Sequence, residues 1–398
     1  MDLISKIQTL ASGIAGDVIK MRHHLHANPE LSFEEFETSK YVYDKLKDIG
    51  LNVEKGIADT GVVAMVYGKD PDSRVIALRA DMDALPIQEE NEIPYRSKKD
   101  GVMHACGHDV HTSSLLGTAI ILNEMRNNFK GSIKLIFQPG EEKIPGGASL
   151  MIKDGVLNNP APQNIIGQHV MAQIPVGKAG FRSGMYMASS DEIYLTVKGK
   201  GGHGAMPENN IDPVLIASHI IVSLQQVISR NADPKIPSVL SFGKVIADGA
   251  TNVIPNDVKI EGTFRTLNEN WRREAHQRIK SIAESIAKGM GGKCEVNILN
   301  GYPYLENNIE LTDHAKACAI DYLGEENVVD LDIWMAAEDF AYFSQKIDAC
   351  FYRLGVGNVS KGITSTVHTP TFNIDEDALK TGSGLMAWIA IQTLLKDI

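Results

Sequence analysis

Cysteine is scarce in this sequence. The 398 residues include four cysteines, at positions 106, 294, 318 and 350, and these are too few and too scattered to form a disulfide framework. Small secreted proteins that depend on disulfides carry many more, at regular spacings. The scarcity therefore excludes a disulfide-stapled fold and favours a reducing compartment.

Positive charge and long apolar runs are also lacking. Lys and Arg total 39 against 50 Asp and Glu, which gives a net charge of -11 and argues against nucleic acid or an anionic membrane as a partner. No apolar run approaches the length of a membrane span. The first residues, with Asp2 and spaced apolar side chains, do not resemble a signal peptide. We expect a cytoplasmic protein.

The length of the chain predicts two domains, because 398 residues exceed what one core usually supports. Nearly continuous apolar strands at 61–67 and 74–80, with helices between such strands, indicate an α/β sheet covered on both faces. From about Gly184 the order of elements changes to β-α-β-β-α-β, which is typical of a ferredoxin-like unit. We therefore predict a two-domain α/β protein. Residues 1–184 and 299–398 would form the catalytic domain, and 185–298 an inserted ferredoxin-like domain.

The densest group of chemically reactive side chains is residues 103–111, which read MHACGHDVH. The apolar run after them predicts a buried helix with Asp109 or Thr112 as its N-cap. Cys106 and His108 would then project from a loop at the mouth of a core, where metal ligands are common. The alternative is a buried free cysteine beside capping histidines.

Other ligand-type side chains follow separate predicted strands. Asp81 and Asp83 come just after the strand 74–80, Glu142 follows a second strand, and His169 ends a third. Open α/β sheets bind ligands beyond the carboxyl ends of their strands. We therefore expect these groups to meet at one edge of the sheet.

Five side chains are the candidates for a metal centre: Cys106, His108, Glu142, His169 and His368. Each suits borderline divalent ions such as Zn, Mn, Co or Ni. Five ligands exceed what one tetrahedral ion uses and suit two ions that share a bridge, for which the Cys106 thiolate is a candidate. Taken singly, His169 or His368 would be interpreted as structural.

The adjacent acids Glu141 and Glu142 follow Pro139–Gly140, which restricts the turn. Neighbouring side chains beyond a strand point in different directions, so one carboxylate can ligate a metal while the other faces a bound water. A carboxylate in that place can take the proton of the water and pass it to a leaving nitrogen. The alternative is an exposed acidic turn.

Two further clusters are less specific. Residues 22–30, RHHLHANPE, lack a cysteine or acidic partner placed with them, so we predict a surface or helix-end role rather than ligation.

The glycine-rich segment 198–205 lacks the Gly-Lys-Ser/Thr ending of a phosphate loop. Its glycines could instead let His203 approach another surface closely and donate a hydrogen bond to an oxyanion. Asn252 and Arg265 lie in the same domain. Arg265 suits bidentate capture of a carboxylate or, alternatively, a surface salt bridge.

Four motifs together resemble the M20 metallopeptidase family: HACGHD at 104–109, QPGEE at 138–142, GHGA at 202–205 and HTP at 368–370. They are most similar to its amidohydrolase branch, which includes hippurate hydrolases, N-acyl-amino-acid amidohydrolases, N-acetyldiaminopimelate deacetylases and auxin-conjugate hydrolases. The resemblance covers nearly the whole chain, and the motifs occur in the order of the family.

The resemblance implies a metal-dependent amidohydrolase that splits a small N-acyl amino acid into a carboxylic acid and an amino acid. It places two divalent ions per subunit on the five candidate ligands, with Glu141 as general base towards a metal-activated water. The inserted domain would be a lid or dimerisation domain of a homodimer or larger homo-oligomer, and His203 would stabilise the oxyanion in the site of the partner protomer. Asn252 and Arg265 resemble residues that hold the substrate carboxylate.

One stretch departs from the wider family, in which a His-x-Asp motif supplies a ligand. Here the corresponding residues are Asp81-Met82-Asp83. The departure agrees with the amidohydrolase branch and leaves Asp81 and Asp83 as residues that would orient a ligand.

Three other functions stay open at this point. A dipeptidase or aminopeptidase of the same family would need an acidic group for the free amine of the substrate. A catalytically inactive homologue would bind a metal or ligand without turnover. A nucleotide-binding protein would rest on the 198–205 segment alone.

Overall fold

The computed structural model describes residues 2–396 and divides the chain into two compact units. The first unit contains the residues up to Met185, then Glu306–Ile333, and then the chain from Asp339 onward. The second unit contains Tyr186–Leu305 and Trp334–Glu338, so it extends past residue 298 and takes in a separate short stretch.

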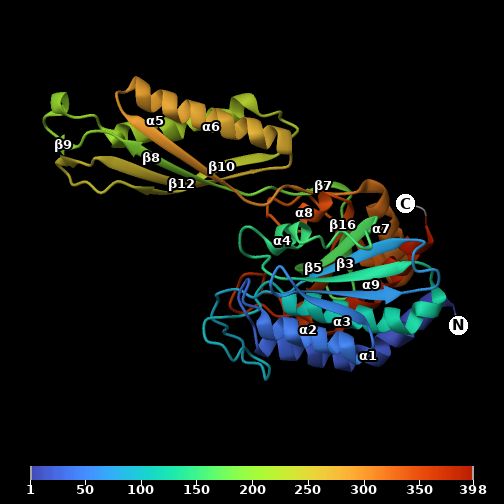
Figure 1. Ribbon diagram of the computed structural model, residues 1–398. Helices are drawn as coiled ribbons and strands as arrows, with labels where there is room; N and C mark the ends of the chain where they lie inside the picture. The colour runs from blue at the N-terminus through green and yellow to red at the C-terminus, as the bar shows by residue number, and fades with distance from the viewer. Residues whose placement is uncertain (1, 397–398) are drawn as a thin grey trace. The chain divides into compact units, whose positions relative to one another are not determined.

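The first unit is built on an eight-stranded mixed sheet (Figure 1). Its four central strands, β4, β3, β5 and β16, run parallel to one another, so their carboxyl ends lie at the same edge. In spatial order the strands are β1 (Asn52–Ile57), β2 (Gly61–Tyr67), β4 (Ser132–Gln138), β3 (Val75–Asp81), β5 (Asn164–Pro175), β16 (Asp348–Gly357), β6 (Ala179–Phe181) and β15 (Val328–Asp330).

Helices cover this sheet, and the long helices α1, α3 and α9 pack against one another. Because both faces are covered, β3 and β4 are buried at every residue, which explains their continuous apolar sequence. The helices of the first unit are α1 (Leu3–Ala27), α2 (Phe36–Asp48), α3 (His108–Met125), α4 (Gly147–Lys153), α7 (Ile309–Leu323), α8 (Ala341–Ser344) and α9 (Asp377–Leu395).

Helix α3 begins earlier than the sequence predicts. Its first residue is His108 and its N-cap is Gly107, so the expected N-caps Asp109 and Thr112 are wrong. Gly107 has φ +84°, and a Cβ there would lie 2.6 Å from Val170. The close packing of this turn, rather than a polar capping side chain, therefore sets the start of the helix.

The second unit is a four-stranded antiparallel sheet with two helices, and the β-α-β-β-α-β order confirms the predicted ferredoxin-like unit. Asp212 caps α5 and Pro213 occupies its first position, as the sequence predicts. The sheet and the two helices enclose a core of their own. The elements are β8 (Asp191–Lys198), α5 (Pro213–Gln226), β10 (Ser238–Ile246), β12 (Asp257–Thr266), α6 (Glu269–Gly289) and β13 (Lys293–Asn300), in the sheet order β10-β12-β8-β13.

Two short strand pairs complete the fold: β9 (Gly202–His203) with β11 (Val253–Ile254), and β7 (Gly184–Met187) with β14 (Leu305–Asn307). Within residues 2–396, none of the helices combines the length and the apolar composition that crossing a membrane requires.

Candidate metal centre and active site

The carboxyl ends of the parallel strands gather the predicted polar groups. Asp81 is the last residue of β3 and pairs in register with Gln138, the last residue of β4. His169 lies within the neighbouring strand β5, and Cys106 lies in the turn before α3. The edge of the sheet at which the sequence predicts a site therefore holds side chains from three strands and one loop.

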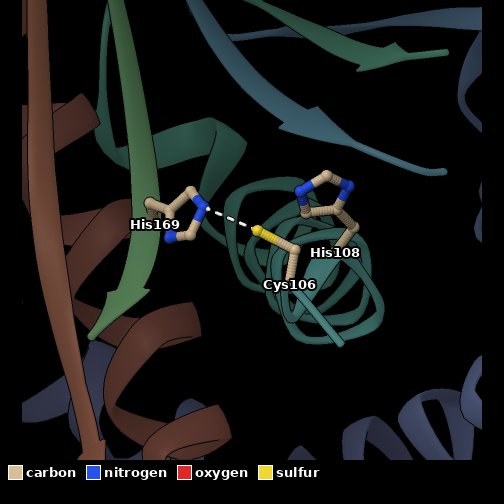
Figure 2. A group of neighbouring side chains, drawn as sticks. All are labelled: Cys106, His108 and His169. Carbon is tan, nitrogen blue, oxygen red and sulfur yellow. Dashed lines mark hydrogen bonds between the residues drawn. The ribbon is translucent and has the colours of Figure 1, made fainter. Parts of the chain in front are cut away.

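Three of the five candidate ligands form one buried group (Figure 2). The donor atoms of Cys106, His108 and His169 lie within 4.8 Å of one another, and Cys106 Sγ is 3.4 Å from His169 Nε2. Figure 2 shows the thiol directed at the His169 ring, with the His108 ring on the other side of the cysteine. A thiol and two imidazoles are the donor types that borderline divalent ions favour.

The remaining two candidates form a second group that shares Cys106. Its donors are Cys106, Glu142 and His368, again within 4.8 Å of one another, and His368 Nε2 lies 3.2 Å from Glu142 Oε1. The His368 side chain is 54% exposed, whereas Cys106 is buried. The structure thus brings all five predicted residues together as two groups joined at one thiol.

Burial dominates the protonation of two of these residues, Cys106 and His169. Burial, together with the nearby carboxylates of Glu142 and Glu141, raises the pKa of the Cys106 thiol well above its ordinary value. Burial also lowers the pKa of His169 well below its ordinary value, which keeps that imidazole neutral. A divalent ion would offset the cost of ionising the thiol, because metal binding favours the thiolate and neutral imidazole.

Asp83 holds two of the candidate ligands in place. Its Oδ1 lies 3.0 Å from His108 Nδ1, while its Oδ2 accepts from the Glu142 backbone N–H at 2.9 Å and from the Ser32 hydroxyl at 2.6 Å. Burial disfavours the charged imidazole of His108, but Asp81 and Asp83 outweigh burial and raise its pKa to about 10. Because Nδ1 is committed to Asp83, His108 Nε2 remains for the centre, and this buried nitrogen makes no hydrogen bond within residues 2–396.

Asp81 makes different contacts. Its carboxylate pairs with His111 Nδ1 and with Arg79 Nη1, both at 2.6 Å, and His111 Nε2 accepts from the Val170 backbone N–H. Both ring nitrogens of His111 are thus used within the protein. Arg79 Nη2 also bonds Asp339 Oδ1 at 2.8 Å. Arg79 and Asp339 are not among the site residues predicted from the sequence, although a charged residue inside an apolar strand was the available signal for Arg79.

The turn that carries Glu141 is fixed from several sides. The Gly140 N–H donates to Glu35 Oε1 at 2.8 Å, and the Asp339 N–H donates to Glu141 Oε1 at 3.3 Å. Gly140 has φ +57°, and a Cβ there would lie 2.3 Å from the Phe33 ring, so this position requires glycine. Glu141 is buried, and its carboxylate lies within 4.8 Å of donors of His108 and Glu142. The alternative of an exposed acidic turn is therefore excluded.

The early histidine cluster lies at the C-terminal end of α1, as the sequence predicts, but only part of it is at the surface. His24 is exposed, whereas two other members are not. Arg22 and His26 are fully buried and both bond Asp109, which follows His108. His104 is buried too, and burial lowers its pKa to about 4.

The second unit holds the remaining three predicted residues. His203, on β9, is exposed, and its Nδ1 accepts from the Ala205 N–H at 3.0 Å. The Asn252 carbonyl accepts from the N–H of Gly204, so Asn252 adjoins the His203 turn. Arg265 lies on β12, where its guanidinium donates to the Met335 carbonyl at 3.2 Å and burial lowers its pKa.

Comparison with protein-family models identifies residues 77–392 as peptidase family M20/M25/M40. The chain belongs to this family. The matched segment contains every candidate ligand, Glu141 and the whole second unit.

Two curated relatives are similar over most of their length. The chain is 40% identical over 378 residues to the N-acetylcysteine deacetylase of Bacillus subtilis, covering 95% of this chain and 97% of the relative. It is 41% identical over 381 residues to the IAA-amino acid hydrolase ILR1-like 2 of Arabidopsis thaliana, covering 95% and 85%. Among solved structures, the Bacillus subtilis YXEP protein, described as a dinuclear metal binding peptidase of the M20 family, has a TM-score of 0.84 and 36% identity, covering 97% of this chain and 100% of that chain.

These findings confirm the predicted family and the two-domain α/β fold. They also confirm the predicted class of enzyme, a hydrolase that acts on amide bonds. The fit of the donor set and the dinuclear relative together support binding of divalent metal ions.

Proposed function

We propose that this protein hydrolyses the amide bond of N-acyl amino acids, with two divalent ions at the carboxyl edge of the first unit's sheet. The observation that carries the proposal is the pair of donor groups that meet at the Cys106 thiol. The ligands would be Cys106, His108, Glu142, His169 and His368. Cys106 belongs to both donor groups, and the donor types of the five residues suit Mn, Zn, Co or Ni.

Glu141 is the proposed general base. It is buried next to the donor groups, and the Asp339 N–H holds its Oε1, so the carboxylate is oriented before substrate arrives. The carboxylate takes a proton from the attacking water and then donates it to the leaving nitrogen of the amide. The divalent ions, when bound, supply Lewis acidity that polarises the amide carbonyl and acidifies water.

Three residues of the second unit complete the proposed chemistry. The Nδ1 of His203 already accepts from Ala205, so Nε2 is the nitrogen that would donate to a developing oxyanion. Asn252 and Arg265 would hold the substrate carboxylate, for which a guanidinium offers two parallel N–H donors. Asp81 and Asp83 would act through the residues that they orient.

The second unit also supports a proposed homodimer. Strand β10 is at the edge of its sheet and exposes Val239, Val245 and Ile246, and helix α5 exposes Leu215 and Val222. An apolar edge strand is a template for pairing with a second chain. Sedimentation of the purified protein at several concentrations tests this part of the proposal.

The reaction is tested by metal reloading. Protein stripped of metal and reloaded with Mn, Zn, Co or Ni should release free amino acid from N-acetyl and aroyl amino acids faster than from plain dipeptides. Faster release from dipeptides would favour a peptidase instead. Metal uptake without turnover of any substrate would favour a homologue that only binds.

The roles of the two adjacent acids are separable. Glu141→Gln should retain wild-type metal content and lose about 10²- to 10⁴-fold in kcat, because only proton transfer is removed. Glu142→Gln should lose metal content as well as activity. Metal analysis and kcat on the same preparations check both expectations, and an active Glu141→Gln variant would reject Glu141 as the base.

A further inference from the structure

Helix α1 places an arginine and a histidine in the interior of the first unit. Arg22 and His26 are one turn apart, and neither side chain is exposed to solvent. A buried charge without a partner is strongly unfavourable, so such residues persist where other groups bind them. Neither residue belongs to the candidate ligands or to the proposed proton transfer.

Both side chains converge on one carboxylate oxygen. Asp109 Oδ2 lies 2.9 Å from Arg22 Nε and 2.8 Å from His26 Nδ1, and His26 Nε2 lies 3.1 Å from Glu89 Oε1. The guanidinium of Arg22 holds the pKa of Asp109 well below its ordinary value despite burial. Asp109 directly follows His108 in the first turn of α3. The network formed by Arg22, His26, Asp109 and Glu89 therefore restrains the turn that presents Cys106 and His108.

The same guanidinium reaches the segment that carries the fifth ligand. Arg22 Nη2 bonds Asn373 Oδ1 at 3.0 Å, and Nη1 lies 3.5 Å from Glu376 Oε1. The two segments also meet directly, because the His368 N–H donates to the Ala105 carbonyl at 2.7 Å. Arg22 is therefore bonded both to the turn that holds Cys106 and His108 and to the chain just beyond His368.

We infer that Arg22 and His26 are positioning residues that set the spacing between the His368 segment and the Cys106–His108 turn. This inference rests on the proposed assignment of those three residues as metal ligands. The two donor groups share the Cys106 thiol. A shift of the His368 segment relative to the Cys106–His108 turn would therefore change the distances between donor atoms. Losing the network would therefore weaken binding of the ion held by Glu142 and His368, and it would lower kcat while leaving KM little changed.

The test uses Co²⁺ as both ligand and spectroscopic probe on the full-length protein. Arg22→Lys keeps the positive charge but loses the planar fork that reaches Asp109, Asn373 and Glu376. His26→Gln keeps a polar group of similar reach. Each variant should show an altered Co²⁺ absorption spectrum, about 10- to 100-fold weaker binding of the second ion and a lower kcat, as is typical when groups that orient ligands are removed.

The same helix offers a matched control. His24 lies in the same run of residues, but it is exposed and stacks on the Tyr41 ring with centroids 4.1 Å apart. His24→Gln should therefore reproduce the wild-type spectrum, affinity and kcat. If His24→Gln changes them as much as Arg22→Lys does, the network has no special role.

A milder variant keeps the inference testable if the buried substitutions prevent folding. Asn373→Ala removes one of the two contacts between Arg22 and the segment beyond His368, at a half-buried position, and leaves the Glu376 contact in place. It should produce the same spectral change in weaker form. Folded variants with a lower melting temperature but an unchanged Co²⁺ spectrum, second-ion affinity and kcat would overturn the inference, since a purely structural role predicts that result.

Wild-type protein that binds no Co²⁺ would instead overturn the proposed metal centre. Wild-type protein that binds two ions without hydrolysing substrate would overturn only the proposed reaction, because the spectrum still reports the spacing.

Discussion

At the scale of single residues, the Asp83 carboxylate joins parts of the chain that lie far apart in sequence. It contacts the His108 ring, the Glu142 backbone and the Ser32 hydroxyl at once. Two of these three partners belong to proposed ligands. Its own pKa is lowered because these contacts, chiefly the bond to His108, outweigh burial, so the carboxylate stays charged.

Substitution of Asp83 should affect metal binding more than stability. Asp83→Asn replaces one acceptor oxygen by an N–H₂ donor, so either the His108 ring or the Glu142 N–H loses its acceptor. We expect metal affinity to fall about 10- to 100-fold. Ser32→Ala is the control, because it removes a different bond to the same carboxylate and should cost about 1 kcal/mol of stability with near wild-type metal affinity. Titration against a chromophoric chelator measures both variants, and equal affinities would contradict this account of Asp83.

The candidate ligands could be predicted from the sequence because their residue types are chemically distinctive and they follow strands or turns. The groups that hold them could not. Glu35 meets Gly140 from 105 positions away, and Arg79 meets Asp339 from 260 positions away. Arginine and glutamate are common at surfaces, so only the folded chain shows that these particular ones are buried and paired.

At the scale of elements, strand β8 and helix α6 are joined by a buried charge cluster in the second unit. Asp191, at the start of β8, bonds Arg272 at 2.9 and 2.5 Å and His276 at 2.7 Å. Burial would raise the pKa of Asp191, but the bonds from His276 and Arg272 outweigh it and lower the pKa below the ordinary 3.8.

The cluster of Asp191, Arg272 and His276 predicts that the difference in stability between the wild type and an Asp191→Asn variant depends on pH. A carboxylate with a lowered pKa in the folded state adds stability above its unfolded pKa, and that stability is lost as the pH falls through the folded pKa. Asp191→Asn should therefore be less stable by about 3 kcal/mol at pH 7. The gap between variant and wild type should shrink as the pH falls below about 4. Urea unfolding followed from pH 7 to pH 3 measures it, and a gap independent of pH would refute this role of the Asp191 charge.

Strands long enough to show a continuous apolar run could be predicted from the sequence, whereas strands of three residues could not. Strand β2 has the predicted bounds because seven residues in a row are apolar or small and bordered by turns. Strands β6, β14 and β15 have three residues each, and so short a run carries no periodicity. Their conformation is set by the neighbours to which they bond.

At the scale of the whole molecule, two units with separate cores should respond differently to metal. All five candidate ligands lie in the first unit, whereas the second unit has its own core. Binding to a native state stabilises it by about 2.7 kcal/mol when free ligand is at 100 times Kd. Calorimetry with and without a chelator should therefore show a metal-dependent transition for the first unit. The transition of the second unit should change little, and equal shifts in both would mean that the units unfold as one.

The candidate ligands differ in how far they lie from solvent. Cys106, His108 and His169 are buried, whereas the His368 side chain is about half exposed. An ion held mainly by the buried three can leave only when the surrounding core opens, so its residence time should be long. The ion beside His368 should exchange rapidly with the medium. Protein purified without added metal would then be a mixture of singly and doubly loaded molecules, and its measured activity would follow the free concentration of the labile ion.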